Sequence, residues 1–176
     1  MNNPDPTTTR RLTLVRHANA EQESDIRDFE RPLSKKGQGE ANEIARRFQE
    51  RGLIPDLIFA SAAVRTRETA EIFAKVLGVA PRLLQVDDSL YLAEGDAIVA
   101  AIRAVGPRVS HLMLIGHNPG ISAAAISLAP ETVQADLPTC GTLTMGVMCR
   151  TWNLVDRRCV FDAERDAPSK KFFDFG

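Results

Sequence analysis

The chain has 176 residues, of which 44% are hydrophobic and 26% charged, a composition typical of a single globular domain. Its formal net charge of −1 provides no general attraction to nucleic acid or to an anionic membrane, so we expect neither as a partner. No stretch approaches the ~20 consecutive apolar residues that span a bilayer, and residues 1–9 lack the apolar run of a signal peptide. We therefore expect a cytoplasmic protein with a flexible arm at residues 1–9 and a single domain over residues 10–176.

Short apolar runs alternate along the chain with amphipathic stretches of helical periodicity. The apolar runs predict strands at residues 12–15, 57–60, 82–86, 111–115, 142–149 and 159–161. The amphipathic stretches predict helices between the caps Ser34 and Gly52, between Ser61 and Gly78, over 97–105 and over 120–128. This alternation predicts an α/β fold, a three-layer α/β/α sandwich with a mostly parallel sheet. No helix separates the last strands, so we expect one late strand to be antiparallel.

Basic and histidine side chains follow three of the predicted strands. Arg16 and His17 come after the first strand, Arg65 follows the second, and His117 follows the strand at 111–115. The carboxyl ends of parallel strands meet at one edge of a sheet, where α/β proteins bind their ligands. We therefore expect these four side chains to lie close together.

Two arginines and two histidines in one place have a chemical meaning. Guanidinium groups match phosphate oxygens with planar, forked hydrogen bonds, and a neutral imidazole is a nucleophile that forms covalent intermediates. Neighbouring cations disfavour protonation of His17 and so favour its attacking form. A metal site made by His17 and His117 would lack a third ligand at a recognisable spacing, so no metal or other cofactor is expected. The third histidine, His111, begins a strand and is interpreted as structural.

Three segments carry a resemblance to a known family. Residues 14–18, Leu-Val-Arg-His-Ala, resemble the RHG signature of the histidine phosphatase (phosphoglycerate mutase-like) superfamily. Residues 61–70 resemble its second motif, SxxxRxxxTA, and residues 115–119 resemble its GHxP motif. The three motifs come in the order of the family and at about its spacing.

The resemblance implies a role for each matching residue. His17 would be the nucleophile that becomes phosphorylated, and Arg16, Arg65 and His117 would hold the phosphoryl group. Asn19 and Asn118 are further candidates for substrate binding, with a plain turn residue as the alternative for Asn19. Ala18 departs from the glycine of the common signature, but small residues fit at this position.

Two features indicate a branch of the family. Residues 31–37 resemble the RPLTxxG segment of small bacterial phosphohistidine phosphatases of the SixA type. Mutases and many phosphomonoesterases of the family have a glutamate acid in the loop after the third strand, and the matching register of this chain places Leu92 there. The alternative is that Glu94 or Asp88 supplies the acid through a shifted loop. Asp25 and Asp28 are weaker candidates, interpreted as solvated loop residues.

The leaving group makes the absence of an acid informative. An alkoxide leaves poorly unless an acid protonates it, whereas an imidazole, with a pKa of about 6.5, needs little help. We therefore predict an enzyme that removes a phosphoryl group from phosphohistidine on a protein. The alternatives are a broad small-molecule phosphomonoesterase or mutase using Glu94 or Asp88, and a non-catalytic phosphate-binding module. The sequence indicates neither the oligomeric state nor the role of the phenylalanine-rich tail at 170–176, expected to dock on the domain surface.

Overall fold

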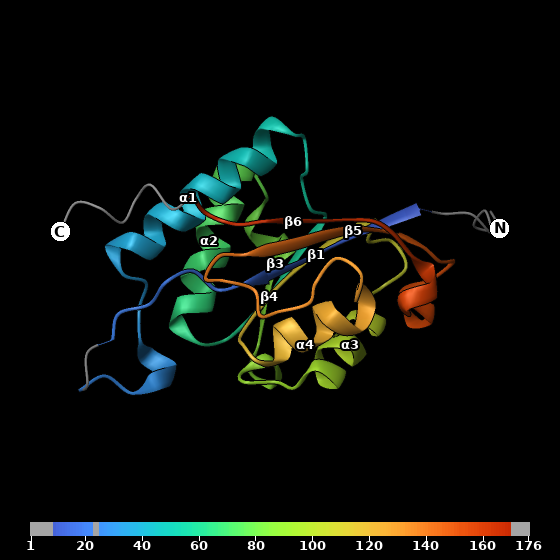
Figure 1. Ribbon diagram of the computed structural model, residues 1–176. Coiled ribbons are helices and arrows are strands. Elements are labelled where there is room, and N and C mark those ends of the chain that lie inside the picture. Colours follow the sequence, from blue (N-terminus) through green and yellow to red (C-terminus); the bar gives the residue numbers. More distant parts are fainter. Residues whose placement is uncertain (1–8, 23–24, 170–176) are drawn as a thin grey trace.

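The computed structural model describes residues 9–22 and 25–169 (Figure 1). The predicted arm and the phenylalanine-rich tail at 170–176 lie outside the described residues, except that Thr9 begins the first strand. Within the described part of the chain, no helix has the length and apolar character needed to cross a membrane.

Six strands form one sheet in the order β3-β2-β4-β1-β5-β6. Four of them are parallel neighbours: β3 pairs with β2, β2 with β4, and β4 with β1. β5 is antiparallel to both β1 and β6, which confirms the expected antiparallel late strand. The strands are β1 (Thr9–Arg16), β2 (Leu57–Ser61), β3 (Leu84–Asp87), β4 (His111–Gly116), β5 (Thr142–Met148) and β6 (Val160–Asp166).

Helices cover both faces of the sheet, as the sequence predicts (Figure 1). One face carries α1 (Lys35–Glu50) and α2 (Val64–Leu77), and the other carries α3 (Gly95–Arg103) and α4 (Gly120–Leu128). Buried β4 divides its side chains between two cores, because successive residues of a strand point to opposite faces. The resulting sandwich is the α/β fold expected from the sequence.

Helix boundaries follow the sequence at one cap and depart from it at another. The Ser34 hydroxyl accepts a hydrogen bond from the Gly37 amide at 3.0 Å and caps α1, as predicted. The expectation that Ser61 caps the next helix is wrong. Ser61 is the last residue of β2, and α2 begins at Val64 without a side-chain cap.

The third strand also begins later than predicted. Residues 81–83 form a turn of 3-10 helix, in which the Leu83 amide donates to the Ala80 carbonyl at 2.8 Å. Pro81 begins that turn, because its fixed φ and missing N–H suit the first helical position better than a strand. β3 is therefore short.

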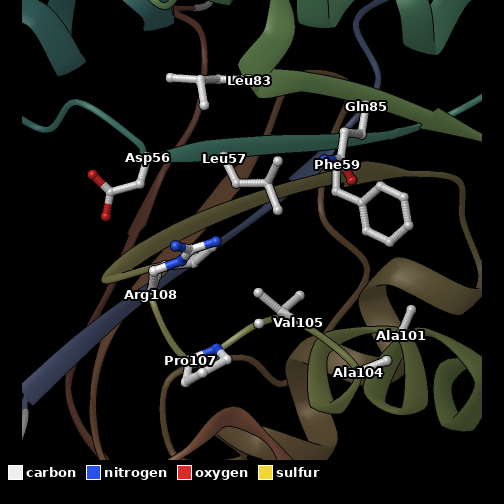
Figure 2. Close-up of a pocket in the computed structure, with 12 residues that line it drawn as sticks. Asp56, Leu57, Phe59, Leu83, Gln85, Ala101, Ala104, Val105, Pro107 and Arg108 are labelled. Carbon is white, nitrogen blue, oxygen red and sulfur yellow. The ribbon is translucent and has the colours of Figure 1, made fainter. Parts of the chain in front are cut away.

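A cavity of about 450 Å³ opens toward the amino ends of β2 and β4. Leu57 and Phe59 of β2 lie on one side of it, and Val105 and Pro107 on the other (Figure 2). The carboxylate of Asp56 accepts the backbone amides of residues 110 and 111 and so serves the fold. None of the residues in the three sequence motifs lines this cavity.

Candidate active site

The motif residues converge at the carboxyl ends of β1, β2 and β4. His17 follows β1, Arg65 lies in the first turn of α2, and His117 follows β4. Together they surround a pocket of about 400 Å³. The pocket is lined by Arg16, His17, Asn19, Ala20, Gln22, Asp28, Arg31, Arg65, Leu92, His117, Asn118 and Thr139.

Two hydrogen bonds define the tautomer of His17. Nδ1 lies 2.8 Å from the Ala18 carbonyl oxygen, which can only accept, so Nδ1 carries the proton. Nε2 lies 3.3 Å from Nε of Arg65, which can only donate. Nε2 is therefore unprotonated, and its lone pair accepts from Arg65, another residue that lines the pocket.

The charge state of His17 agrees with this geometry. Burial lowers the pKa of His17 from 6.5 to about 4, against the opposing effect of the Ala18 hydrogen bond. The nearby charges of Arg65, Arg16 and Arg31 lower it further. The imidazole is thus neutral at pH 7, as the sequence predicts for a histidine among cations.

Arg65 connects the two histidines. Arg65 is only 2% exposed. Its Nη2 lies 3.3 Å from Nδ1 of His117, and its Nε contacts Nε2 of His17. The same guanidinium donates to the Asp28 carbonyl through Nη1 and to the Asp28 carboxylate through Nη2 at 2.9 Å. Arg65 thus presents donors to the space between the two rings.

His117 is fixed from its other side by Ser61. Nδ1 accepts from Arg65, so Nε2 carries the proton and donates to the Ser61 hydroxyl at 2.8 Å. Burial, with the charges of His17 and Arg65, lowers the pKa of His117 to about 3. The two imidazole rings lie 5.2 Å apart between centroids, so both border the same small volume.

Arg16 approaches the pocket from the end of β1. Its Nη1 donates to the Leu137 carbonyl at 2.9 Å, and burial lowers the pKa of its guanidinium. Its buried Nε has no hydrogen-bond partner among the described residues. A buried donor without a partner is costly, and an oxyanion is the group that would satisfy it.

Comparison with known proteins agrees with this geometry. The family model of the histidine phosphatase superfamily (branch 1) matches residues 12–91. An uncharacterised chloroplastic protein of Arabidopsis thaliana is 32% identical over 158 residues, covering 85% of this chain and 72% of that protein. The chain belongs to the histidine phosphatase superfamily.

Solved structures of SixA proteins share this fold. The chain is similar to a protein from Nakamurella multipartita assigned as the phosphohistidine phosphatase SixA, at a TM-score of 0.76 and 25% identity, over 93% of this chain and 99% of that one. It is also similar to a SixA of the same assignment from Agrobacterium tumefaciens, at a TM-score of 0.73 and 28% identity, over 88% and 97% of the two chains. Within the histidine phosphatase superfamily, the chain therefore resembles the SixA-type members.

The two asparagines predicted to bind substrate both line the pocket of this histidine phosphatase. The Asn19 side-chain oxygen accepts from the Ser34 hydroxyl at 2.7 Å, which ties the residue to the start of α1. Asn118 donates to the Leu137 carbonyl at 3.1 Å, the same oxygen that accepts from Arg16. Asn118 therefore helps to hold the backbone that positions Arg16.

The structure places three of the four candidate acids, Glu94, Asp88 and Asp25, outside the lining of the pocket. Leu92 lines the pocket with 54% of its surface exposed, at the position expected for the family's acid. Glu94 lines a neighbouring hollow beside Gly120, and Asp88 begins a short 3-10 turn at Asp88–Leu90. Neither carboxylate, nor that of Asp25, is among the groups that line the catalytic pocket.

Asp28 is the carboxylate that does reach the pocket, and sequence reasoning treated it as a solvated loop residue. Its oxygens accept from Tyr91 at 2.7 Å, from Arg31 at 2.5 Å and from Arg65 at 2.9 Å. The Tyr91 hydrogen bond, followed by those of Arg31 and Arg65, holds the pKa of Asp28 well below its usual range. An acid that is always ionised orients cations but has no proton to donate.

The sequence carried no signal for several of these contacts. Asp28 begins a short 3-10 turn, Asp28–Glu30, far from β2 and β4 along the chain, so only the folded structure shows its contact with Arg65. The pairing of Ser61 with His117 also spans 56 residues. Among the described residues, no group of three or more His, Cys, Asp or Glu lies in position to hold a metal ion.

Proposed function

We propose that this protein is a phosphatase that removes a phosphoryl group from phosphohistidine on a protein, through a covalent intermediate on His17. The observation that carries the proposal is the pairing of an unprotonated Nε2 with a pocket whose described lining residues include no carboxylic acid free to donate a proton. Leu92 stands where an acid would be, and Asp28, the one carboxylate among the described residues that line the pocket, is held ionised by three donors.

The first step transfers the phosphoryl group to His17. The Nε2 lone pair forms a bond to phosphorus while the bond between phosphorus and the substrate nitrogen breaks, and its electron pair returns to the substrate imidazole. The phosphoryl oxygens meet the guanidinium groups of Arg16 and Arg65, which stabilise the charge spread over them. Arg65 already contacts Nε2 of His17, so it lies where those oxygens would be held.

The leaving group decides which substrates suit this pocket. A substrate imidazole that carries a proton on its other nitrogen departs as a neutral ring and needs no acid from the enzyme. An alkyl phosphate departs as an alkoxide, and without a positioned acid the step loses a factor of roughly 10²–10⁴. The pocket therefore favours the phosphorus–nitrogen bond over the phosphorus–oxygen bond of an alkyl ester.

The second step returns the enzyme to its starting state. A water oxygen forms a bond to phosphorus, the bond to Nε2 breaks with its electron pair returning to the ring, and inorganic phosphate leaves. The similar SixA structures, assigned as phosphohistidine phosphatases, support phosphohistidine as the group from which the phosphoryl is removed. We keep as predictions a single catalytic domain over residues 10–176, a cytoplasmic location, and the absence of nucleic-acid and membrane partners.

Competing substrates test the proposal directly. The enzyme is mixed with a phosphohistidine protein, with phosphoramidate, with p-nitrophenyl phosphate and with sugar phosphates, and kcat/KM is measured for each. We expect the phosphorus–nitrogen substrates to react fastest and the His17→Ala variant to react with none. Faster turnover of the sugar phosphates would reject the substrate class, and binding of phosphate without any turnover would support a non-catalytic module.

A further inference from the structure

A buried carboxylate lies behind the catalytic pocket and has no part in the steps above. Glu40 is in α1, and the residue is only 5% exposed. Its Oε2 accepts the Asn19 backbone amide at 2.8 Å, and its Oε1 accepts the Thr139 hydroxyl at 3.0 Å. Glu40 therefore joins the loop after β1 to the loop before β5.

The amide that Glu40 accepts belongs to a particular peptide group. The N–H of Asn19 and the C=O of Ala18 are the two polar ends of one peptide bond, and that C=O accepts the Nδ1 proton of His17 at 2.8 Å. One continuous chain of hydrogen bonds thus runs from the Glu40 carboxylate through the 18–19 peptide to the imidazole.

The contacts of Glu40 indicate an ionised carboxylate. Oε2 accepts from the Asn19 amide, which can only donate, and Oε1 accepts from the Thr139 hydroxyl, so both contacts suit an ionised carboxylate. Burial has the largest effect and raises the pKa of Glu40, against the opposing effects of the Asn19 amide, the Thr139 hydroxyl and the charges of Lys36 and Arg16. The two donated hydrogen bonds and these cations favour the ionised form, which places a negative charge in a site otherwise rich in cations.

We propose that Glu40 is a positioning residue that acts on His17 through the Ala18–Asn19 peptide, holding the proton on Nδ1 and stabilising the positive charge that the ring gains when Nε2 bonds to phosphorus. This inference rests on the proposed function of His17 as the nucleophile. Its role resembles that of a carboxylate bonded directly to a catalytic histidine, with one peptide group placed between them.

The physical basis is the mutual polarisation of hydrogen bonds in series. An anion at the N–H end of a peptide increases the negative charge on its carbonyl oxygen, and each bond in such a chain strengthens its neighbour by perhaps 10–30%. The ring of His17 becomes cationic only as the bond to phosphorus forms. The stabilisation is therefore greater in the transition state than in the free enzyme, which is the condition for a faster reaction.

The variant Glu40→Gln separates this role from simple support. Glutamine has the shape of glutamate, and it can accept the Asn19 amide through its oxygen while its NH₂ donates to the Thr139 hydroxyl. The substitution thus keeps both contacts and removes the charge. A merely structural Glu40 predicts no change in rate, whereas the proposal predicts slower transfer to His17.

Glu68 provides a matched control. It lies in α2, and its Oε2 accepts a backbone amide, that of Leu33, at 2.6 Å. The Leu33 peptide has no hydrogen bond to His17 among those the structure shows. Glu68→Gln therefore makes the same chemical change at another amide near the pocket, without touching the chain of bonds to the imidazole.

The experiment measures phosphoryl transfer from phosphoramidate in a single turnover with enzyme in excess. We expect Glu40→Gln to slow the transfer on the order of tenfold, the scale at which outer hydrogen-bond partners act on a functional histidine, and Glu68→Gln to keep the wild-type rate. Equal rates in the two variants would overturn the inference. No transfer by the wild-type enzyme would instead reject the proposed function.

A second measurement on the wild-type protein does not depend on the stability of a variant. Orthovanadate, a phosphate analogue, is added while the backbone amides are followed by NMR. We expect the Asn19 amide proton to move downfield as vanadium bonds to Nε2, because the hydrogen bond to Glu40 strengthens, while the Leu33 amide proton stays in place. An unmoved Asn19 amide in the vanadate-bound enzyme would contradict the inference.

Discussion

At the scale of single residues, Arg65 is the side chain on which the geometry of the pocket depends most. Its guanidinium donates in three directions, to His17, to His117 and to Asp28. A lysine ammonium is a point charge without a planar fork, so it cannot reach all three groups at once. The exchange of one cation for the other therefore tests geometry with the charge kept constant.

We predict that Arg65→Lys lowers kcat/KM for phosphohistidine by about 10²–10³, the cost of removing a positioned donor from an oxyanion site. Arg67→Lys is the matched control, because Arg67 lies two residues further along the same helix and is exposed. Steady-state kinetics of both variants check the prediction. Comparable losses of kcat/KM in the two variants would show that the effect comes from a change in α2 and not from the loss of the Arg65 guanidinium.

The sequence predicts some site residues better than others, for a physical reason. Arg16, His17 and His117 lie next to strands, and the edge of a parallel sheet brings strand ends together whatever the loops do. Asp28 reaches the site because of the path that the loop after β1 takes, and Glu40 reaches it because of the way α1 packs. Local sequence patterns encode neither of these. Their roles follow only from contacts between segments distant in the sequence.

At the scale of elements, the start of α1 packs directly against the loop that carries His17. A β-carbon added to Gly37 would lie 1.9 Å from the Asn19 carbonyl oxygen, a backbone atom that cannot yield without moving the loop. The Asn19 carbonyl also accepts the Ser34 amide at 3.0 Å. Gly37 is thus required by close approach, and its place in the RPLTxxG-like segment has a structural meaning.

We predict that Gly37→Ala destabilises the protein by about 3 kcal/mol, the upper part of the range for overpacking, and lowers activity by displacing Asn19. Gly39→Ala is the control in the same helix, because a β-carbon there would meet no atom within 4 Å. Alanine is the better helix former, so this control should gain about 1 kcal/mol. Urea unfolding and single-turnover kinetics of both variants provide the measurements. Equal stability of the two would contradict the packing argument.

Apolar periodicity is sufficient to predict the layers of the fold but not every boundary. The strand at 111–115 and the apolar stripe of α1 appear where the sequence places them, because continuous burial leaves a strong pattern. The serine at 61 is a good cap by residue type, yet its hydroxyl is engaged by His117. The hydrogen bond between Ser61 and His117 thus overrides the local preference of serine for the start of a helix.

At the scale of the whole molecule, all three histidines of the chain are held neutral by the fold. Burial lowers the pKa of both His17 and His111 to about 4 and that of His117 to about 3, from 6.5 in each case. Outside the site, His111 has Nε2 at 2.9 Å from the Thr13 hydroxyl and Nδ1 at 3.2 Å from the Ile54 carbonyl. The expectation that His111 is structural agrees with these contacts.

These shifts predict how stability depends on pH. Between about pH 4 and pH 6.5 the unfolded chain binds protons at histidines that the folded protein keeps neutral, so the free energy of unfolding rises with pH and levels off above about 6.5. Each histidine contributes a slope of up to about 1.4 kcal/mol per pH unit in that window. Glu40, whose pKa burial raises, opposes the slope because its folded form binds a proton more readily.

The variant His111→Gln tests this origin without altering the catalytic pocket, because His111 does not line it. An amide can accept from the Thr13 hydroxyl and donate to the Ile54 carbonyl, but it takes up no proton in this range. The free energy of unfolding, measured with urea at several pH values between 4.5 and 6.5, should therefore rise less steeply with pH than in the wild type. The difference in slope should correspond to about one proton fewer taken up on unfolding. His17→Asn should remove a similar share of the slope and abolish turnover as well. An unchanged slope in His111→Gln would show that the pH dependence of stability comes from other groups. The comparison of the two variants separates His111, which supports the fold, from His17, which we propose carries the chemistry.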